Sequence, residues 1–539
     1  MAGSPHLLHG CFLYSIILSM LALASPASAQ ENPAQSAETT VSVSDCLSCG
    51  PFDFKNVPPV QTLPRTGPFP NPPKDCGYYS LLDQLRGEAR PSPPKYGYPS
   101  FALMQPGFFN ADFRYLDDPN NTSTNLFDPL KRIRLGDDWL FSTGGQVWNR
   151  SMNEGNSRLT DVNNNYNLFR ARAYTDLWYQ DRFRVFAEFI TAQDFDPELA
   201  PLPIDANHAD FQNLFLDFKV MEWEGKPIYV RVGRQEMLYG SQRLISTLDW
   251  ANTRRTFQGV SAFRQGEKWD ASAFWVQPVI PNATEMDSVD NNQNFAGTWW
   301  TYRPEKGQAA DFYYLFLDNT NNQTQQGIVR APFNVHTLGT RYSGDKNHFL
   351  WDAELALQFG EQGNQSIFAG MATAGAGYHF EDLPLNPTFW LFYDYASGDS
   401  SPNSGNFNTF NQLFPFGHYY LGWIDLVGRQ NIQDLNAHLY LYPTNWVTLW
   451  FQYHRFWLAE SQDALYNAAG VATRRSPDGS AGRDVGQELD VVANFHITKN
   501  ADIMVGYSKL FGGEFLQKTT GPNQASNADL LYVIYSFRW

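Results

Sequence analysis

The sequence is poor in cysteine, in charge and in long apolar runs. Its 539 residues include only 4 cysteines, and charged residues make up 17% of the chain. Beyond the first 29 residues, no stretch has the roughly 20 apolar residues that a membrane-spanning helix requires. Lysine and arginine number 39 against 55 acidic residues. This balance argues against a nucleic-acid-binding protein, which would carry a basic surface.

Sequence motifs of common active sites are also missing. The chain has no G-x-S-x-G nucleophile elbow and no H-E-x-x-H zinc motif, and its 10 histidines are scattered. Cys46-Leu47-Ser48-Cys49 is followed by Gly50, where covalent haem attachment would need histidine. A short disulfide in an oxidising compartment is the simplest interpretation, and it leaves one of Cys46, Cys49 and Cys76 as a free thiol. We therefore expect no enzyme activity, no bound metal and no cofactor.

The start of the chain predicts export. Residues 11–24 form an apolar core, and Ala27-Ser28-Ala29 follows with the small-residue pattern of signal-peptide cleavage. Residues 1–29 are therefore predicted to be a signal peptide. Residues 30–127 are rich in proline, glycine, serine and asparagine, a composition typical of an extended or partly disordered segment. We expect this leader, with Cys46, Cys49 and Cys76, to lie in the periplasm, and the sequence leaves open whether it plugs the pore, tethers to a partner or does neither.

From residue 128 onward, segments of about ten residues alternate apolar and polar positions between turn residues. This period of two predicts strands and not helices. The eighteen candidate strands are 139–150, 166–179, 182–193, 209–220, 228–238, 257–265, 268–278, 296–303, 308–318, 334–343, 347–359, 367–380, 387–395, 432–442, 446–459, 484–498, 501–511 and 529–539.

The connections between these strands alternate in length. Short ones such as 180–181 and 499–500 alternate with long ones such as 151–165 and 396–431. An up-and-down barrel in an outer membrane has this pattern, with short periplasmic turns and long extracellular loops. Closure would also remove the unpaired strand edges that lipid does not tolerate. Residues 128–539 are therefore predicted to be an all-β domain, a closed antiparallel transmembrane β-barrel of about 18 strands, with a soluble secreted β-protein as the alternative.

If the apolar faces contact lipid, arginines point into the lumen. In strand 166–179, Phe169, Ala171 and Ala173 alternate with Arg170 and Arg172. Carboxylates occupy the same polar faces, so two interpretations remain open. The arginines form a basic ladder that binds anions bidentately, or they and the acids neutralise one another in a polar interior. The candidate pore residues of the strands are Arg150, Arg170, Arg172, Arg184, Arg231 and Arg341, with Asp176, Glu188, Asp217 and Glu354 as acidic partners.

Two blocks of the sequence resemble the alginate export family of outer-membrane proteins. They are FDPLKRIRLGDDWLFSTGGQVWNR (127–150) and YVRVGRQEMLYGSQRLISTLDWANTRRTFQGV (229–260). The resemblance implies an 18-stranded barrel whose pore is lined by arginines and narrowed by inward-folded loops. By position, it implies that Arg234, Arg243 and Arg254 reach the lumen from such a loop. For Asp249, we favour a salt bridge that anchors this loop.

The function we expect is that of a channel for an acidic polysaccharide, alginate-like, or for other acidic solutes. A few arginines in a narrow throat focus the field even when the net charge is negative, here −16. The alternative is a general or neutral-solute porin, which a mixed lumen of arginines and acids would also serve. We expect a monomer that contacts outer-membrane lipid, the barrel-insertion machinery and periplasmic secretion partners, but no nucleic acid.

The last ten residues, LLYVIYSFRW (530–539), alternate apolar residues and end on tryptophan. This pattern resembles the signal by which outer-membrane barrels are recognised for insertion. Tyr535, Phe537 and Trp539 are the candidate residues of that signal, and the last strand is predicted to pair with the first.

Overall fold

The computed structural model describes residues 51–59, 67–103, 105–322, 325–402 and 404–539. Cys46 and Cys49 lie outside these residues, whereas Cys76 is exposed and has a free thiol. The compact unit considered below runs from Asp53 to Trp539. None of the described helices is both long and apolar enough to span a membrane.

Eighteen long strands of the described chain form one antiparallel sheet. They are β2 (Trp139–Gly155), β3 (Asn164–Tyr179), β4 (Phe183–Phe195), β5 (Asn207–Trp223), β6 (Lys226–Gln235), β7 (Phe257–Gln265), β8 (Trp269–Ile280), β10 (Gln293–Tyr302), β11 (Gln308–Asn319), β14 (Phe333–Lys346), β15 (Phe349–Gln362), β16 (Gln365–His379), β17 (Thr388–Ala396), β19 (Ile432–Thr444), β20 (Val447–Leu458), β23 (Asp484–Thr498), β24 (Ala501–Gly512) and β25 (Ala528–Arg538).

The remaining elements are short. The helices are η3 (Phe54–Asn56), α2 (Leu81–Arg86), η4 (Phe108–Asn110), η5 (Arg114–Asp117), η6 (Asp128–Leu130), η7 (Ser157–Leu159), α3 (Gly417–Tyr420) and α4 (Glu514–Lys518). The short strands are β1 (Ile133–Leu135), β9 (Ser288–Val289), β12 (Gln325–Gln326), β13 (Val329–Arg330), β18 (Asn406–Phe407), β21 (Ala464–Tyr466) and β22 (Ala472–Arg475). They lie in the leader and in the loops.

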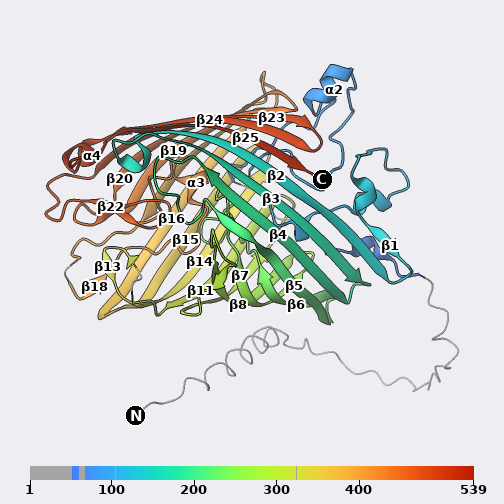
Figure 1. Ribbon diagram of the computed structural model, residues 1–539, viewed down its shortest axis with the longest axis horizontal. Coiled ribbons are helices and arrows are strands. Elements are labelled where there is room, and N and C mark those ends of the chain that lie inside the picture. Colours follow the sequence, from blue (N-terminus) through green and yellow to red (C-terminus); the bar gives the residue numbers. More distant parts are fainter. Residues whose placement is uncertain (1–50, 60–66, 104, 323–324, 403) are drawn as a thin grey trace, which may run out of the picture. The chain divides into compact units, whose positions relative to one another are not determined.

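The sheet closes on itself. β25 pairs with β2, with Gln146 opposite Arg538 and Asn153 opposite Leu531, and β2 pairs on its other side with β3. In Figure 1, β24 and β25 run alongside β2, β3 and β4. The predicted barrel is therefore confirmed, and each predicted strand is present with ends that differ by up to five residues.

The alternation of connections defines two rims. Turns such as 224–225 and 499–500 lie at the short-turn rim, and loops such as 236–256 and 397–431 begin at the long-loop rim. The one short connection on the long-loop side, among the described residues, is the tight turn 363–364 between β15 and β16.

The outer face of the barrel is apolar and the inner face is polar. In β15, Leu355 and Leu357 are 57% and 56% exposed, whereas Glu354 and Gln358 on the alternate positions are buried. Exposed large apolar side chains recur on nearly every long strand. This distribution suits a wall with lipid outside and polar groups inside.

The interior of the barrel is filled. Residues 96–103 and 105–117 of the leader, which we call the arm, place Tyr98, Phe108, Phe109 and Phe113 against inward-facing aromatic rings of β3, β4 and β5. Loops 236–256 and 397–431 also carry many buried residues. The sequence left open whether the leader plugs the pore, and in the structure part of it packs inside the sheet.

Candidate functional site

Arginines of five strands lie on the inner wall of the barrel. Strand alternation puts Arg170 and Arg172 on the inner face of β3, while Ala171 and Ala173 point outward. Few of these guanidinium groups reach solvent, because the arm and the loops cover them. The predicted arginines on this wall are Arg150, Arg170, Arg172, Arg184, Arg231 and Arg341, all at most 7% exposed.

Most of these arginines are paired with carboxylates. Nε of Arg172 lies 2.6 Å from Oε1 of Glu188, and Nε of Arg184 lies 2.7 Å from Oδ1 of Asp176. Asp217 accepts two hydrogen bonds from Arg231. Removing one partner of such a buried pair would leave an uncompensated charge. The acids therefore hold the guanidinium groups in fixed positions.

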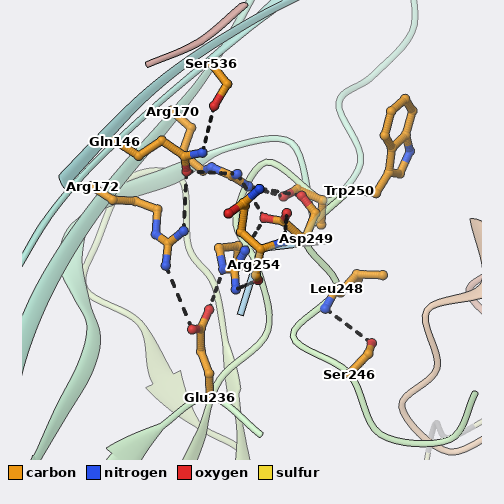
Figure 2. Close-up of polar contacts among 12 residues, drawn as sticks. Gln146, Arg170, Arg172, Glu236, Ser246, Leu248, Asp249, Trp250, Arg254 and Ser536 are labelled. Carbon is orange, nitrogen blue, oxygen red and sulfur yellow. Dashed lines mark hydrogen bonds and ion pairs between the residues drawn. The ribbon is translucent and has the colours of Figure 1, made fainter. Parts of the chain in front are cut away.

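Loop 236–256 brings a second set of charges to this wall. Asp249 lies 3.1 Å from Nη2 of Arg170 and also pairs with Arg254, which in turn pairs with Glu236. Figure 2 shows Asp249 between the two arginines, with Arg172 bridging Gln146 and Glu236. Burial raises the pKa of Asp249, but Arg254 and Arg170 outweigh it and hold the pKa below its usual range.

The tip of the arm joins the same cluster. The backbone N–H of Gln105 donates to Oδ2 of Asp249 at 2.8 Å, and Nη2 of Arg254 donates to the carbonyl oxygen of Gln105 at 3.2 Å. The arm, which enters from the short-turn rim, therefore meets a loop that enters from the long-loop rim. Their contact lies at a cluster of buried charges.

Arg243 ties loop 236–256 to another part of the wall. Its guanidinium pairs with Asp352 at 2.9 Å and with Glu354 at 3.0 Å, both on β15. Tyr420 of loop 397–431 donates to the carbonyl oxygen of Ser241 at 2.5 Å. Asp352 also pairs with Arg341 of β14 at 2.7 Å. The two loops and the wall thus form one connected network.

Cavities remain on both sides of the contact between arm and loop. Toward the short-turn rim, two cavities of about 350 Å³ and 90 Å³ are both lined by Phe263, Gln265 and Asp270. Thr247 lines the smaller of the two. Toward the long-loop rim, Trp250 and Ala251 line a cavity of about 140 Å³. Asp249 lies between these loop residues in sequence and lines none of these cavities.

The alginate export family matches residues 140–528, which is more than half of the chain. The chain belongs to the alginate export family. Two solved structures with similar folds are from Pseudomonas aeruginosa. They are OpdQ (TM-score 0.51, 11% identity, 74% of this chain and 97% of that chain) and OccD3 (TM-score 0.50, 9% identity, 74% and 91%). No curated protein matches the sequence significantly.

In this alginate export family barrel, Arg234 lies on the opposite face of β6 from Arg231. It pairs across the sheet with Leu214, which is 42% exposed on the outer face, and its guanidinium lies 3.1 Å from Asp210. Residues directly opposite each other on neighbouring strands share a face. The register therefore puts the backbone of Arg234 at an outward position, while its guanidinium turns to Asp210, which is 1% exposed and lies opposite buried Ile190. Its expected role at the lumen stays a prediction.

Arg150 lies on the inner wall beside the long-loop cavity. It donates from Nη1 to the carbonyl oxygen of Trp250 at 3.0 Å, and its guanidinium lies 4.1 Å from the Trp250 ring. Trp250 is therefore held against β2 by a cation–π contact as well as a hydrogen bond. This contact adds a further anchor for loop 236–256.

Three further residues of the site were not predicted from the sequence. Glu236, Gln146 and Arg538 are all at most 3% exposed on the inner side, and Glu236 pairs with Arg254. Arg538 pairs with Asp502 of β24. Period-two alternation along β25 would have placed Arg538 inside, because Tyr535 and Val533 face outward. Glu236 directly follows Gly233-Arg234-Gln235, but its partner is brought in only by the fold of the loop.

The candidate insertion residues lie at the seam where β25 closes on β2. Tyr535 is 43% exposed on the outer face, and Phe537 is paired with Val147 of β2. Trp539 exchanges two backbone hydrogen bonds with Gly145. Their role in insertion stays a prediction.

Proposed function

We propose that this outer-membrane channel passes an acidic polysaccharide, alginate-like, or other acidic solutes along its arginine wall. The observation that carries the proposal is the set of inner-wall arginines on β2, β3, β4, β6 and β14, joined by Arg243 and Arg254 from loop 236–256. Membership of the alginate export family supports the choice of cargo. The channel itself follows from the family and the closed barrel.

During this passage, carboxylates of the cargo would replace the acidic side chains that now bind the arginines. Arginine stays charged at all relevant pH values, and its planar donors bind a carboxylate in two parallel hydrogen bonds. A uronate group entering the lumen would take over donors now used by Asp217, Glu188 or Asp249. Because the wall already holds its arginines in place, little ordering is needed when an acidic sugar replaces an acidic side chain.

A second candidate function is a porin for neutral solutes. It is favoured by the pairing of Arg172, Arg184 and Arg231 with Glu188, Asp176 and Asp217, which nearly cancels the charge of the wall. In liposome-swelling assays, equal uptake of neutral and acidic sugars of the same size would support this function and contradict the first.

We further propose that the short-turn rim, with the leader, faces the periplasm and the long loops face outward. Periplasmic secretion partners would then meet the exposed part of the leader, which includes α2 with Leu85 at 75% exposed. The insertion machinery would meet the seam at β25. Protease added outside intact cells should cleave the long loops but not α2.

Ion selectivity in planar bilayers tests the proposal. We expect the wild-type channel to favour chloride over potassium, and the R170Q/R172Q/R231Q variant to lose this preference, because three lumen charges are neutralised. The R455Q variant is the matched control, since Arg455 lies opposite Leu435, which is 42% exposed on the outer face, and its selectivity should equal that of the wild type. A wild-type channel that favours potassium, or a triple variant that still favours chloride, would contradict an arginine-based filter.

A further inference from the structure

Backbone carbonyl oxygens of the arm accept hydrogen bonds from three arginines. Nη1 of Arg538 donates to the carbonyl oxygen of Pro99 at 2.7 Å, and Nη2 of Arg184 donates to that of Phe109 at 2.9 Å. Arg254 donates to the carbonyl oxygen of Gln105 at 3.2 Å. Each carbonyl oxygen carries partial negative charge and sits where the oxygen of an anion would bind. The arm therefore imitates an anionic chain.

Two aromatic rings of the arm pack against the guanidinium groups of further arginines. The Phe108 ring lies 4.2 Å from the guanidinium of Arg172, and the Phe109 ring lies 4.6 Å from that of Arg231. Such contacts block the face of the guanidinium, while the carbonyl oxygens block its edge. The arm thus occupies five arginines in all, at their faces or at their edges.

The start of the arm and the leader segment that follows it meet at the same point on the short-turn rim. Asn500, in the turn between β23 and β24, donates to the hydroxyl of Tyr96 at 2.7 Å and accepts from Asn125 at 2.8 Å. The segments on either side, around Gly87 and Asn120, are exposed. The arm can therefore leave the lumen as a loop, without any chain end being threaded through the barrel.

We propose that the arm is a built-in competitor that closes the short-turn end of the channel by occupying the arginine donors an acidic polysaccharide would use. An entering polyanion displaces it by taking over these donors. A tethered segment acts at an effective concentration in the millimolar range. The arm therefore occupies the arginine donors when cargo is dilute, and a multivalent polyanion displaces it. This inference rests on the proposed function, because it assumes an acidic cargo.

Releasing the arm from folded protein tests its closing role. Protease sites are inserted after Gly87 and after Asn120, and the purified, folded channel is cut in detergent before reconstitution into bilayers. Cutting at both sites frees the arm, and we expect channel conductance to rise several-fold. The matched control carries only the first site, so that its arm stays attached to the barrel and its conductance should stay at the uncut level.

The F108A/F109A variant gives the same test without proteolysis. Loss of both rings removes their packing against Phe186 and Phe215 and their contacts with Arg172 and Arg231, so the arm should leave the lumen. The L85A variant truncates an exposed leucine of the same leader and should behave as the wild type. Retained heat-modifiable mobility on gels identifies the barrels that fold.

A peptide of residues 96–117 tests the competition itself. Added to the arm-released channel, the peptide should block the current again. Oligogalacturonate should raise the peptide concentration needed for half-block in proportion to its own concentration, by at least about tenfold when it saturates the channel. Dextran oligomers of equal length should not change that concentration.

Three outcomes would contradict the inference. Unchanged conductance after release of the arm would show that it does not close the channel. Block by peptide that oligogalacturonate leaves unchanged would show that arm and cargo use different donors, even where the channel prefers chloride. If instead arm release opens a channel that prefers potassium and admits dextran as readily as oligogalacturonate, the acidic cargo itself is wrong, and the shared-donor inference fails with it.

Discussion

The D249A variant should detach loop 236–256 from the arm and from β3, and open the barrel from the long-loop side. Asp249 is 1% exposed and pairs with both Arg170 and Arg254. Its removal leaves two buried cations without their shared partner, which costs roughly 3–5 kcal/mol. It also removes the acceptor of the Gln105 N–H. We expect amide hydrogen exchange in residues 236–256 to accelerate strongly and channel conductance to rise.

Two control variants separate the effect of the Asp249 charge from that of its hydrogen bond with Gln105. The D249N variant keeps the acceptor for Gln105 but loses the charge, and should give an intermediate effect. The E267A variant removes an exposed carboxylate in a short turn and should change neither exchange nor conductance. If D249A exchanges like the wild type in this loop, the loop is held by Arg243 and Trp250 and not by Asp249.

The lowered pKa of Asp249 also predicts a pH dependence. A carboxylate with a folded pKa below its unfolded one contributes stability above the unfolded pKa, and loses it as pH falls through the folded pKa. Wild-type loop 236–256 should therefore stay closed at neutral and mildly acidic pH and loosen only below the usual range for aspartate. D249N should show no such transition.

The Y535D/F537D variant should be secreted but fail to accumulate as inserted barrel. Both residues lie on the outer face of β25, the strand that closes the sheet on β2. Each charge would have to face lipid or its interface, and since about 1.4 kcal/mol is a factor of 10, the inserted fraction should fall at least about tenfold. Heat-modifiable mobility and detergent extraction measure that fraction.

The Y535W/F537W variant is the control, because tryptophan is accepted at membrane interfaces. Its yield of inserted barrel should match that of the wild type. Normal insertion of the aspartate variant would mean that neither recognition of this strand nor its contact with lipid limits assembly.

The strands could be predicted because their pattern is local. In β3, alternation of Arg170 and Arg172 with Ala171 and Ala173 sets both the secondary structure and the face of each residue. Errors concentrate at strand ends, as at 151–155 of β2, where polar residues continue the pairing toward the loop. The period of two carries no information about where pairing stops.

The centre of the site could be predicted only in part. Arg170 was expected on the inner wall, but its hydrogen bond to Asp249 joins residues 79 positions apart. The hydrogen bond between Gln105 and Asp249 joins residues 144 positions apart. Such contacts depend on how loop 236–256 and the arm fold inside the barrel, and neither segment has a periodic pattern. The sequence also left open whether the acids neutralise the arginines. In the structure, Arg172, Arg184 and Arg231 each pair with a carboxylate of the same wall.

The closing seam has a consequence for the order of folding. The bond between Gln146 and Ser536 joins residues 390 positions apart, and the entropy cost of closing so long a loop is about 5 kcal/mol. The arm bridges this seam, since Tyr98 bonds both Trp539, just beyond β25, and Tyr174 of β3. The arm can therefore stabilise the pairing of β25 with β2 when the last strand joins the sheet during folding; we call this contact the clamp. Withdrawal of the arm removes this clamp, so forced unfolding of an open channel should begin between β2 and β25.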